Sequence, residues 1–189
     1  VEKQRSFFRT GETLPVDFRI RALEKLRSCI RENEKAIARA LKKDLGKSPF
    51  ESYMCETGLV LDELSFMLRH VRSLAREKRV PSPLAQFPAR SFKKPSPYGV
   101  TLIMSPWNYP FLLTIEPLVD TIAAGNTAVL KPSAYSPCTS ELIGKLAREC
   151  FAEKYVAVIT GGRAENACLL REKFDFIFFT GSQSVGKEV

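Results

Sequence analysis

Long apolar runs are missing from this sequence of 189 residues: none approaches the roughly 20 residues that a membrane-spanning helix needs. The residues after Val1 are charged and polar, so the apolar stretch of a secretory signal is missing too. The apolar content of 44% is nevertheless enough to bury a core. We therefore expect a soluble globular protein, with no membrane association indicated in this part. The absent initiator Met suggests trimming or a fragment.

Paired cysteines and metal-ligand clusters are also scarce. No C-x-x-C pair occurs, the cysteine count is odd, and the single histidine, His70, has no Cys or carboxylate cluster at ligand spacing. A disulfide framework or a zinc site is therefore disfavoured, and a cytoplasmic location is expected because the cytosol keeps thiols reduced. Most cysteines are predicted to be packing residues. They are Cys29, Cys55, Cys138, Cys150 and Cys168.

Positive charge is in excess, with a formal net charge of +8. Clustered Lys and Arg can neutralise phosphates, so a basic, non-catalytic nucleic-acid-binding protein is one alternative. The two local concentrations, Arg69–Arg79 and Arg90–Lys94, are not regularly interleaved with the aromatic residues on which single-stranded bases stack. We therefore interpret the basic residues as solvated surface and expect no nucleic-acid partner.

Two halves with different periodicity meet near residue 99. In residues 1–80, apolar residues recur every three, four or seven positions, which predicts one long amphipathic helix over Asp17–Leu45 and a second over Val60–Leu74. Gly46 lies where the first helix would end. Residues 81–98 are rich in proline, which disfavours helix and predicts an extended linker with bridging strands.

Residues 99–189 alternate short β-rich runs with helical segments. Continuous apolar strands separated by helices favour right-handed βαβ crossovers and a parallel sheet covered on both faces. The fold class is therefore predicted to be α/β, with a doubly wound, Rossmann-like parallel sheet that is incomplete at its C-terminal end. The predicted strands are Val100–Met104, Thr127–Leu130, Val156–Ile159 and Phe176–Phe179. The predicted helices are Phe111–Ala124, Ser140–Cys150 and Arg163–Glu172.

A polar or glycine-bearing turn follows each of the four predicted strands. In parallel sheets of this kind, ligands bind outside the carboxyl ends of the strands. Because these ends lie at one edge, the four turns should come together and form a ligand site. The turns are Ser105–Pro110, Lys131–Ser133, Thr160–Gly162 and Thr180–Ser182.

Two of these turns contain side chains that suit catalysis or binding. Asn108 lies between two prolines, and its carboxamide is either part of a stiff turn or a preorganised donor to an oxyanion. The residues alone leave both interpretations open. Lys131 is either a surface lysine or an ammonium that reaches a ribose or phosphate from the end of an inner strand, and we favour the second interpretation.

The last turn leads into a predicted helix whose N-terminus presents unpaired N–H groups that suit a phosphate. Gly181–Lys187 also fits the pattern G-x-x-x-x-G-K of a nucleotide-hydrolysing P-loop, but the Ser or Thr needed next is replaced by Glu188. The dinucleotide pattern G-x-G-x-x-G is absent. A nucleotide ligand is therefore predicted, and a P-loop-like module stays an alternative.

Three linked motifs occur in order along the chain, at Ser105–Pro110, Ala123–Ser133 and Phe179–Gly186. Together they resemble the aldehyde dehydrogenase superfamily, and the leading helices and Trp-Asn-Tyr-Pro look most like its class-three branch. The similarity runs from about Asp17 to Val189. It implies oxidation of medium and long aliphatic or aromatic aldehydes to carboxylic acids with NAD or NADP, through a cysteine thiohemiacetal and a thioester.

The resemblance also implies roles for single positions. Asn108 is the implied donor to the oxyanion of the intermediate, and Lys131 is the implied ligand of the adenosine ribose. The other positions implied to bind the cofactor are Ser105, Trp107, Ser133, Gly162, Gly181, Ser182 and Val185.

Two departures from the family pattern matter. The family often has Glu after Lys-Pro-Ser, where this sequence has Ala134. This change removes a hydrogen bond to the ribose hydroxyls and also a repulsion of a 2′-phosphate, so we expect NADP to be tolerated. The family's cysteine nucleophile and water-activating glutamate lie beyond the last turn. We therefore expect an N-terminal fragment that is inactive alone and requires the remainder of the enzyme, for example as a separate chain.

The complete enzyme is expected to be a homo-oligomer. A fragment of this kind should also leave a sheet edge and apolar helix faces exposed.

Overall fold

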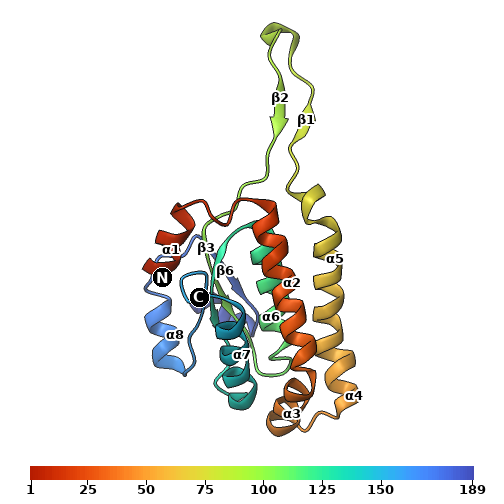
Figure 1. Cartoon of the computed structure of the whole chain (residues 1–189). Helices are drawn as coiled ribbons and strands as arrows, with labels where there is room; N and C mark the ends of the chain where they lie inside the picture. Colours follow the sequence, from red (N-terminus) through yellow and green to blue (C-terminus); the bar gives the residue numbers. More distant parts are fainter.

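The computed structural model describes residues 1–189, and its centre is a four-stranded sheet (Figure 1). All three strand pairs are parallel, and the strand order is β5-β4-β3-β6. The predicted parallel α/β fold is therefore confirmed. The strands are β3 Val100–Met104, β4 Thr127–Lys131, β5 Val156–Val158 and β6 Phe176–Phe179.

Helices cover both faces of this sheet because alternate strand residues point to opposite sides. Ile103 and Leu130 pack into a large core that also contains residues of six helices. Leu102 and Met104 point the other way, into a smaller core with Leu169. The helices that contribute to the two cores are α1 Glu2–Arg9, α2 Val16–Glu32, α3 Glu34–Leu45, α5 Gly58–Leu74, α6 Leu112–Ala124, α7 Pro137–Cys150 and α8 Arg163–Leu169.

The N-terminal half is helical, as predicted, but its first long helix is broken. The sequence predicted one helix over Asp17–Leu45, whereas the structure has α2 and α3 with Asn33 between them at φ −104° and ψ 9°. The Asn33 side chain donates to the Cys29 carbonyl at 2.9 Å and so competes with the helical backbone bonds. The break turns α3 so that it packs against α7.

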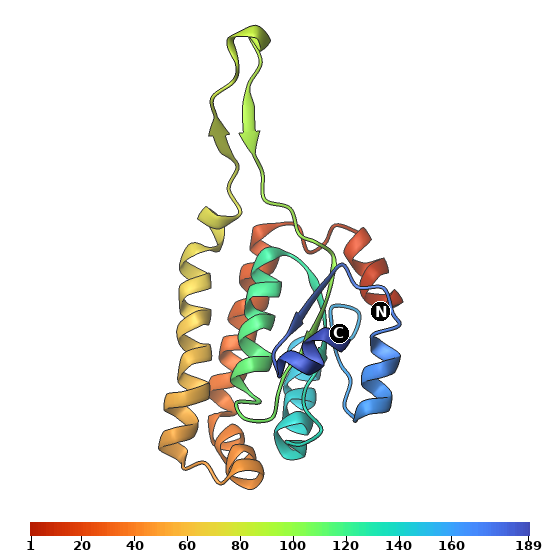
Figure 2. The same cartoon turned by 180° about the vertical axis from the view of Figure 1, so that it is seen from behind.

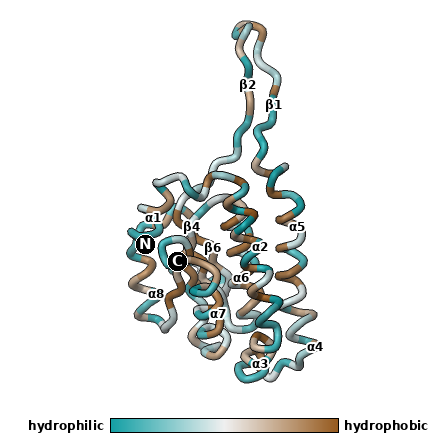
Figure 3. Tube along the Cα trace, in the orientation of Figure 1, coloured by the Kyte–Doolittle hydropathy of each residue, from teal (hydrophilic) through white to brown (hydrophobic).

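The remaining elements of this half are α1 Glu2–Arg9, the short helix α4 Pro49–Ser52 and the π-helical turn η1 Tyr53–Thr57, which runs directly into α5. Figure 3 shows hydrophilic and hydrophobic residues alternating along α2 and α5, as expected of helices with one buried face. None of the helices combines the length and the apolar character that crossing a bilayer requires.

The proline-rich segment forms an arm that projects from the helical body (Figures 1 and 2). Its strands β1 Lys78–Val80 and β2 Ser91–Lys93 are antiparallel, and Lys78 lies opposite Lys93. The only helical piece between them is the 3-10 turn Leu84–Gln86. The segment predicted as an extended linker with bridging strands is therefore a two-stranded hairpin, whose first strand begins at Lys78.

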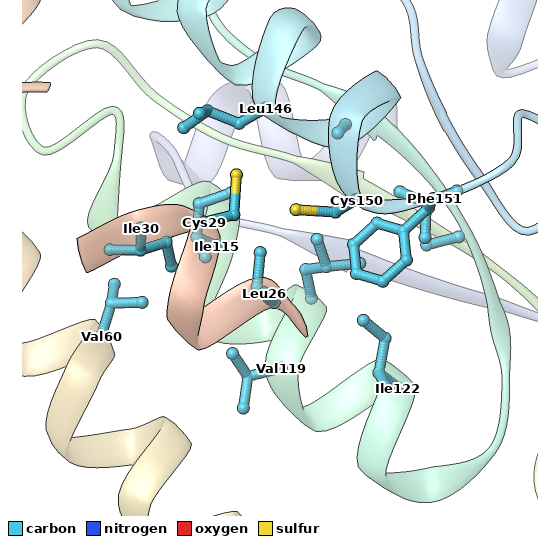
Figure 4. Close-up of a cluster of buried hydrophobic side chains, with 14 of the residues drawn as sticks. Leu26, Cys29, Ile30, Val60, Ile115, Val119, Ile122, Leu146, Cys150 and Phe151 are labelled. Atoms are coloured by element: carbon cyan, nitrogen blue, oxygen red, sulfur yellow. The ribbon is translucent and has the colours of Figure 1, made fainter. Parts of the chain in front are cut away.

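The large core contains two of the five cysteines, and all five are free. Figure 4 shows the sulfur atoms of Cys29 and Cys150 facing each other among Leu26, Ile115 and Phe151. Burial raises the pKa of both thiols. These two residues therefore pack as small apolar groups, as the sequence predicted for most of the cysteines.

Strand β6 is partly exposed, whereas the sequence predicted a sheet covered on both faces. Its residues Phe176, Ile177 and Phe178 are 36–42% exposed, whereas the residues of β3 and β4 are buried. Because β6 pairs with β3 on one side only, its other side is an open edge. This exposure agrees with the expectation of an uncovered sheet edge.

Candidate functional site

The turns after the four strands lie together along one edge of the sheet. Backbone hydrogen bonds continue past the strand ends: Ser105 N donates to Lys131 O at 3.3 Å, and Thr180 N donates to Met104 O at 3.0 Å. On the other side, Ile159 N donates to Leu130 O at 2.9 Å. The structure therefore brings all four predicted turns to the edge where α/β sheets bind their ligands.

Lys131 is the one charged residue among the predicted site positions, and it is buried, with 4% exposure. Its ammonium donates to the carbonyls of Gly161 at 2.7 Å and Pro132 at 3.1 Å, and thereby links the second turn to the third. Burial lowers the pKa of Lys131, and the charge of Glu165 opposes this shift. An ammonium has three N–H donors, so one of them is not used by these two carbonyls.

Gly162 is the N-cap of α8, and its N–H donates to Glu165 Oε2 at 2.6 Å. No atom lies within 4 Å of the position that a Cβ would take at Gly162. At Gly181, in contrast, a Cβ would collide with the ring of Phe179. Both glycines therefore keep backbone accessible at the edge of the sheet, one beside open space and one over an aromatic ring.

Ser182 is the N-cap of α9 Gln183–Glu188, and its hydroxyl accepts from Val185 N at 3.4 Å. Val185 is exposed. The predicted helix start after the last glycine turn is therefore present, with the remaining N–H groups of its first turn directed out of the helix.

The hydroxyl groups of Ser105 and Ser133 stabilise their own turns. Ser105 is buried, and its Oγ lies 2.5 Å from Oγ1 of Thr114 in α6. Ser133 Oγ accepts from Tyr135 N at 3.2 Å. These side chains therefore stabilise the two turns at the site edge, and the Ser133 carbonyl also accepts from the Ser140 hydroxyl at 2.7 Å.

Trp107 and Asn108 are exposed at the loop after β3. The side chain of Asn108 makes no hydrogen bond within the chain, so its amide is available to a ligand. Its backbone carbonyl, in contrast, accepts from Lys47 Nζ at 2.9 Å. The loop is therefore held through its backbone and leaves the carboxamide free.

Sequence reasoning missed Lys47 and its partner Glu56. Their side chains are 2.6 Å apart and 8% and 0% exposed. A signal was present in the sequence, because Glu56 lies four positions before Val60 and eight before Leu64 and so places a carboxylate on an apolar helical stripe. The partners of this carboxylate could not be predicted, because the N–H groups of Phe111 and Leu112 lie far along the chain, after β3.

Asp44 is a second acidic residue that sequence reasoning missed. Its carboxylate accepts from Cys138 N at 3.1 Å and from Thr139 N at 2.7 Å, and so caps α7, which begins at Pro137. The hydrogen bond with Asp44, followed by burial, raises the pKa of the Cys138 thiol. Cys138 therefore belongs to a helix-start turn and is not activated as a nucleophile.

The fold and the site edge define the class of the protein: a doubly wound α/β protein whose polar turns meet at the carboxyl ends of parallel strands. The model of the aldehyde dehydrogenase family matches residues 1–189. Among curated relatives, 4,4'-diaponeurosporen-aldehyde dehydrogenase of Staphylococcus aureus is 42% identical over 185 residues, which are 98% of this chain and 40% of that protein.

A second relative, aldehyde dehydrogenase family 3 member A2 of Rattus norvegicus, is 39% identical over 100% of this chain and 39% of its own length. The solved substrate-bound state of Staphylococcus aureus AldH superposes with a TM-score of 0.97 and 41% identity, over 99% of this chain and 41% of that one. The chain belongs to the aldehyde dehydrogenase family. It spans about two fifths of the length of the relatives that it matches.

Family membership favours the aldehyde dehydrogenase interpretation over the P-loop-like module and the nucleic-acid-binding protein. The family uses nicotinamide cofactors and acts on aldehydes.

Proposed function

We propose that this chain is the N-terminal, cofactor-binding part of an NAD(P)-dependent aldehyde dehydrogenase that oxidises aldehydes to carboxylic acids. One observation carries the proposal: in a chain of this family, Asn108, Lys131 and the glycine turns lie along a single edge of the sheet. The names of the relatives, which are aldehyde dehydrogenases, support the reaction class.

The residues at this edge fit a nicotinamide dinucleotide. Lys131 has an N–H that the carbonyls of Gly161 and Pro132 do not use, which suits a ribose hydroxyl. Gly162 borders open space, and the N-terminus of α9 after Gly181 provides N–H groups. Ser105, Trp107, Ser133, Ser182 and Val185 complete the proposed cofactor contacts. When bound, the cofactor supplies the acceptor for the hydride of the aldehyde.

The proposed role of Asn108 is to stabilise the negative charge that develops on the aldehyde oxygen. The carboxamide is exposed and free of internal hydrogen bonds, so it has no competing partner when an oxyanion forms. Asn108→Ala in the complete protein should lower kcat by about 100- to 1,000-fold, the usual cost of removing one oxyanion donor, with nucleotide affinity unchanged. Wild-type kcat in this variant would refute the role.

The second cofactor proposal concerns NADP. Ala134 places no carboxylate beside the ribose, so a 2′-phosphate meets no repulsion there. Titration of the complete protein with both nucleotides should give affinities within about tenfold of each other. Ala134→Glu should shift the ratio of the two affinities towards NAD by about tenfold or more, because it adds a hydrogen bond to one ligand and a like charge to the other. A ratio that does not change would contradict the proposal.

The cysteine nucleophile and the glutamate that activates water are proposed to come from polypeptide outside these residues. Within the chain, the pKa of the Cys29, Cys138 and Cys150 thiols is raised, which disfavours the reactive thiolate. The chain alone should therefore produce no NAD(P)H from an aldehyde. Sustained NAD(P)H production by the purified chain, with no companion polypeptide, would refute this.

We also infer that the complete enzyme is a cytoplasmic homo-oligomer. The free state of all five cysteines supports a reducing compartment. Light scattering of the complete protein tests the oligomeric state, and a single-subunit mass would refute it.

A further inference from the structure

The ion pair between Lys47 and Glu56 is the most deeply buried one in the structure. Its two charged atoms, Nζ and Oε1, are 2.6 Å apart, and the side chains are 8% and 0% exposed. The other pairs involve more exposed side chains; that between Asp17 and Arg72, for example, is 65–67% exposed. Because desolvating two charges is costly, a buried pair is expected to have a specific structural or functional role.

The pair holds the loop that carries Asn108 at two points. Lys47 Nζ donates to the carbonyl of Asn108 at 2.9 Å. The second carboxylate oxygen of Glu56, Oε2, accepts from the backbone N–H groups of Phe111 at 2.8 Å and Leu112 at 3.1 Å. The loop is thus fixed at the residue whose amide is free and again at the first turn of α6.

The ring of Tyr109 adds a third contact between the pair and the loop. The ammonium of Lys47 lies 4.1 Å from the centroid of this ring, within the range of a cation–π interaction. Lys47 therefore contacts two successive loop residues, through the carbonyl of Asn108 and the side chain of Tyr109.

A local irregularity of the helix places Glu56. It lies in the π-helical turn η1 between α4 and α5, and such turns are frequent at functional sites. Gly58 allows the turn to close, because a Cβ there would come within 2.8 Å of the carbonyl of Tyr53. The position of the carboxylate is thus set by backbone geometry as well as by burial.

We propose that Lys47 and Glu56 are positioning residues for Asn108, which hold its carboxamide in the orientation needed to meet the developing oxyanion. The inference rests on the proposed oxyanion role of Asn108. A contrasting explanation is that the pair only caps α6 and stabilises the fold. The two differ in what happens when Asn108 has no amide to position.

The test is a double-mutant cycle in the complete protein. Lys47→Met removes the cation and its bond to the Asn108 carbonyl. It should lower kcat by about 10-fold or more with Asn108 present, but by less than about 3-fold in the Asn108→Ala background, because residues that act as a unit are non-additive. The affinity for the nucleotide should stay the same in both backgrounds.

A second variant separates positioning from capping. Lys47→Met combined with Glu56→Gln leaves no unpaired buried charge and keeps a carbonyl oxygen that can accept from α6, so folding should be preserved. It should reproduce the kcat loss of Lys47→Met. Asp17→Asn, which removes the exposed pair with Arg72, is the matched control and should leave kcat unchanged.

Each result decides the proposal. Equal losses in both Asn108 backgrounds, unchanged kcat in both pair variants, or failure of both variants to fold would overturn the positioning role and leave the proposed function standing. If Asn108→Ala itself leaves kcat unchanged, the oxyanion role is refuted and the positioning role with it.

Discussion

Replacing Lys131 with methionine should weaken nucleotide binding without unfolding the protein. The substitution keeps most of the apolar stem, which is buried, and removes only the ammonium. Two of its three N–H donors are used by the carbonyls of Gly161 and Pro132, at 2.7 and 3.1 Å. The proposed third bond, to a ribose hydroxyl, is the one that the nucleotide would lose.

The expected size follows from this one bond. A hydrogen bond that involves a charged group contributes about 1.5–3 kcal/mol, and each 1.4 kcal/mol corresponds to a factor of ten in affinity. Lys131→Met should therefore raise the Kd for NAD and for NADP by about 10- to 150-fold. Calorimetric titration of the complete protein with each nucleotide measures both values.

Lys145→Met is the matched control, because it removes the same charge from an exposed position on α7, where the Lys145 side chain is 62% exposed. It should change Kd by less than about twofold, since exposed charges are screened by solvent and salt. If Lys131→Met leaves Kd unchanged, or if Lys145→Met weakens binding equally, the assignment of Lys131 to the ribose is refuted.

Two further predictions concern stability. Asp44→Ala should lower the free energy of unfolding by about 1–2 kcal/mol in urea titrations, because α7 loses an N-terminal cap that also binds the buried Thr139 hydroxyl at 2.7 Å; no change would contradict the capping role. Burial, with the nearby charges of Glu63 and Glu116, raises the pKa of Asp120 from 3.8 to about 6, so the folded chain retains a proton that the unfolded chain releases between these values. Stability should therefore fall as pH rises through this window, and Asp120→Asn should raise Tm near pH 7 but hardly near pH 4, whereas an equal effect at both would contradict the prediction.

Much of the fold could be predicted because its signals are local. The strands Val100–Met104 and Phe176–Phe179 were predicted with the bounds that the structure shows, since continuous apolar runs between turn residues are typical of strands in parallel sheets. The break at Asn33 was missed because this residue lies among polar positions and leaves the apolar period intact on either side. Its effect depends on packing against α7, which no local pattern contains.

The candidate site was predictable to a similar extent. Strand ends and turn residues predicted the place of Asn108 and Lys131, because parallel strands necessarily end at one edge. The residues that hold this edge were not predictable: Glu56 binds N–H groups 55 positions away, and Asp44 binds α7 at a separation of 94. The first has a weak signal, a carboxylate on an apolar stripe, and the second has none.

The sequence by itself determined most of the strands and helices and which chemical groups lie at the strand ends, because side-chain periodicity and turn composition act over a few residues. Only the tertiary structure decided that the Lys131 ammonium donates to the carbonyls of Pro132 and Gly161. It also decided that the Asn108 carboxamide makes no hydrogen bond within the chain, whereas the Asn108 carbonyl accepts from Lys47. The physical reason is that burial and hydrogen bonding depend on which distant groups meet in space. These contacts form when the whole chain folds, and local sequence patterns do not encode them.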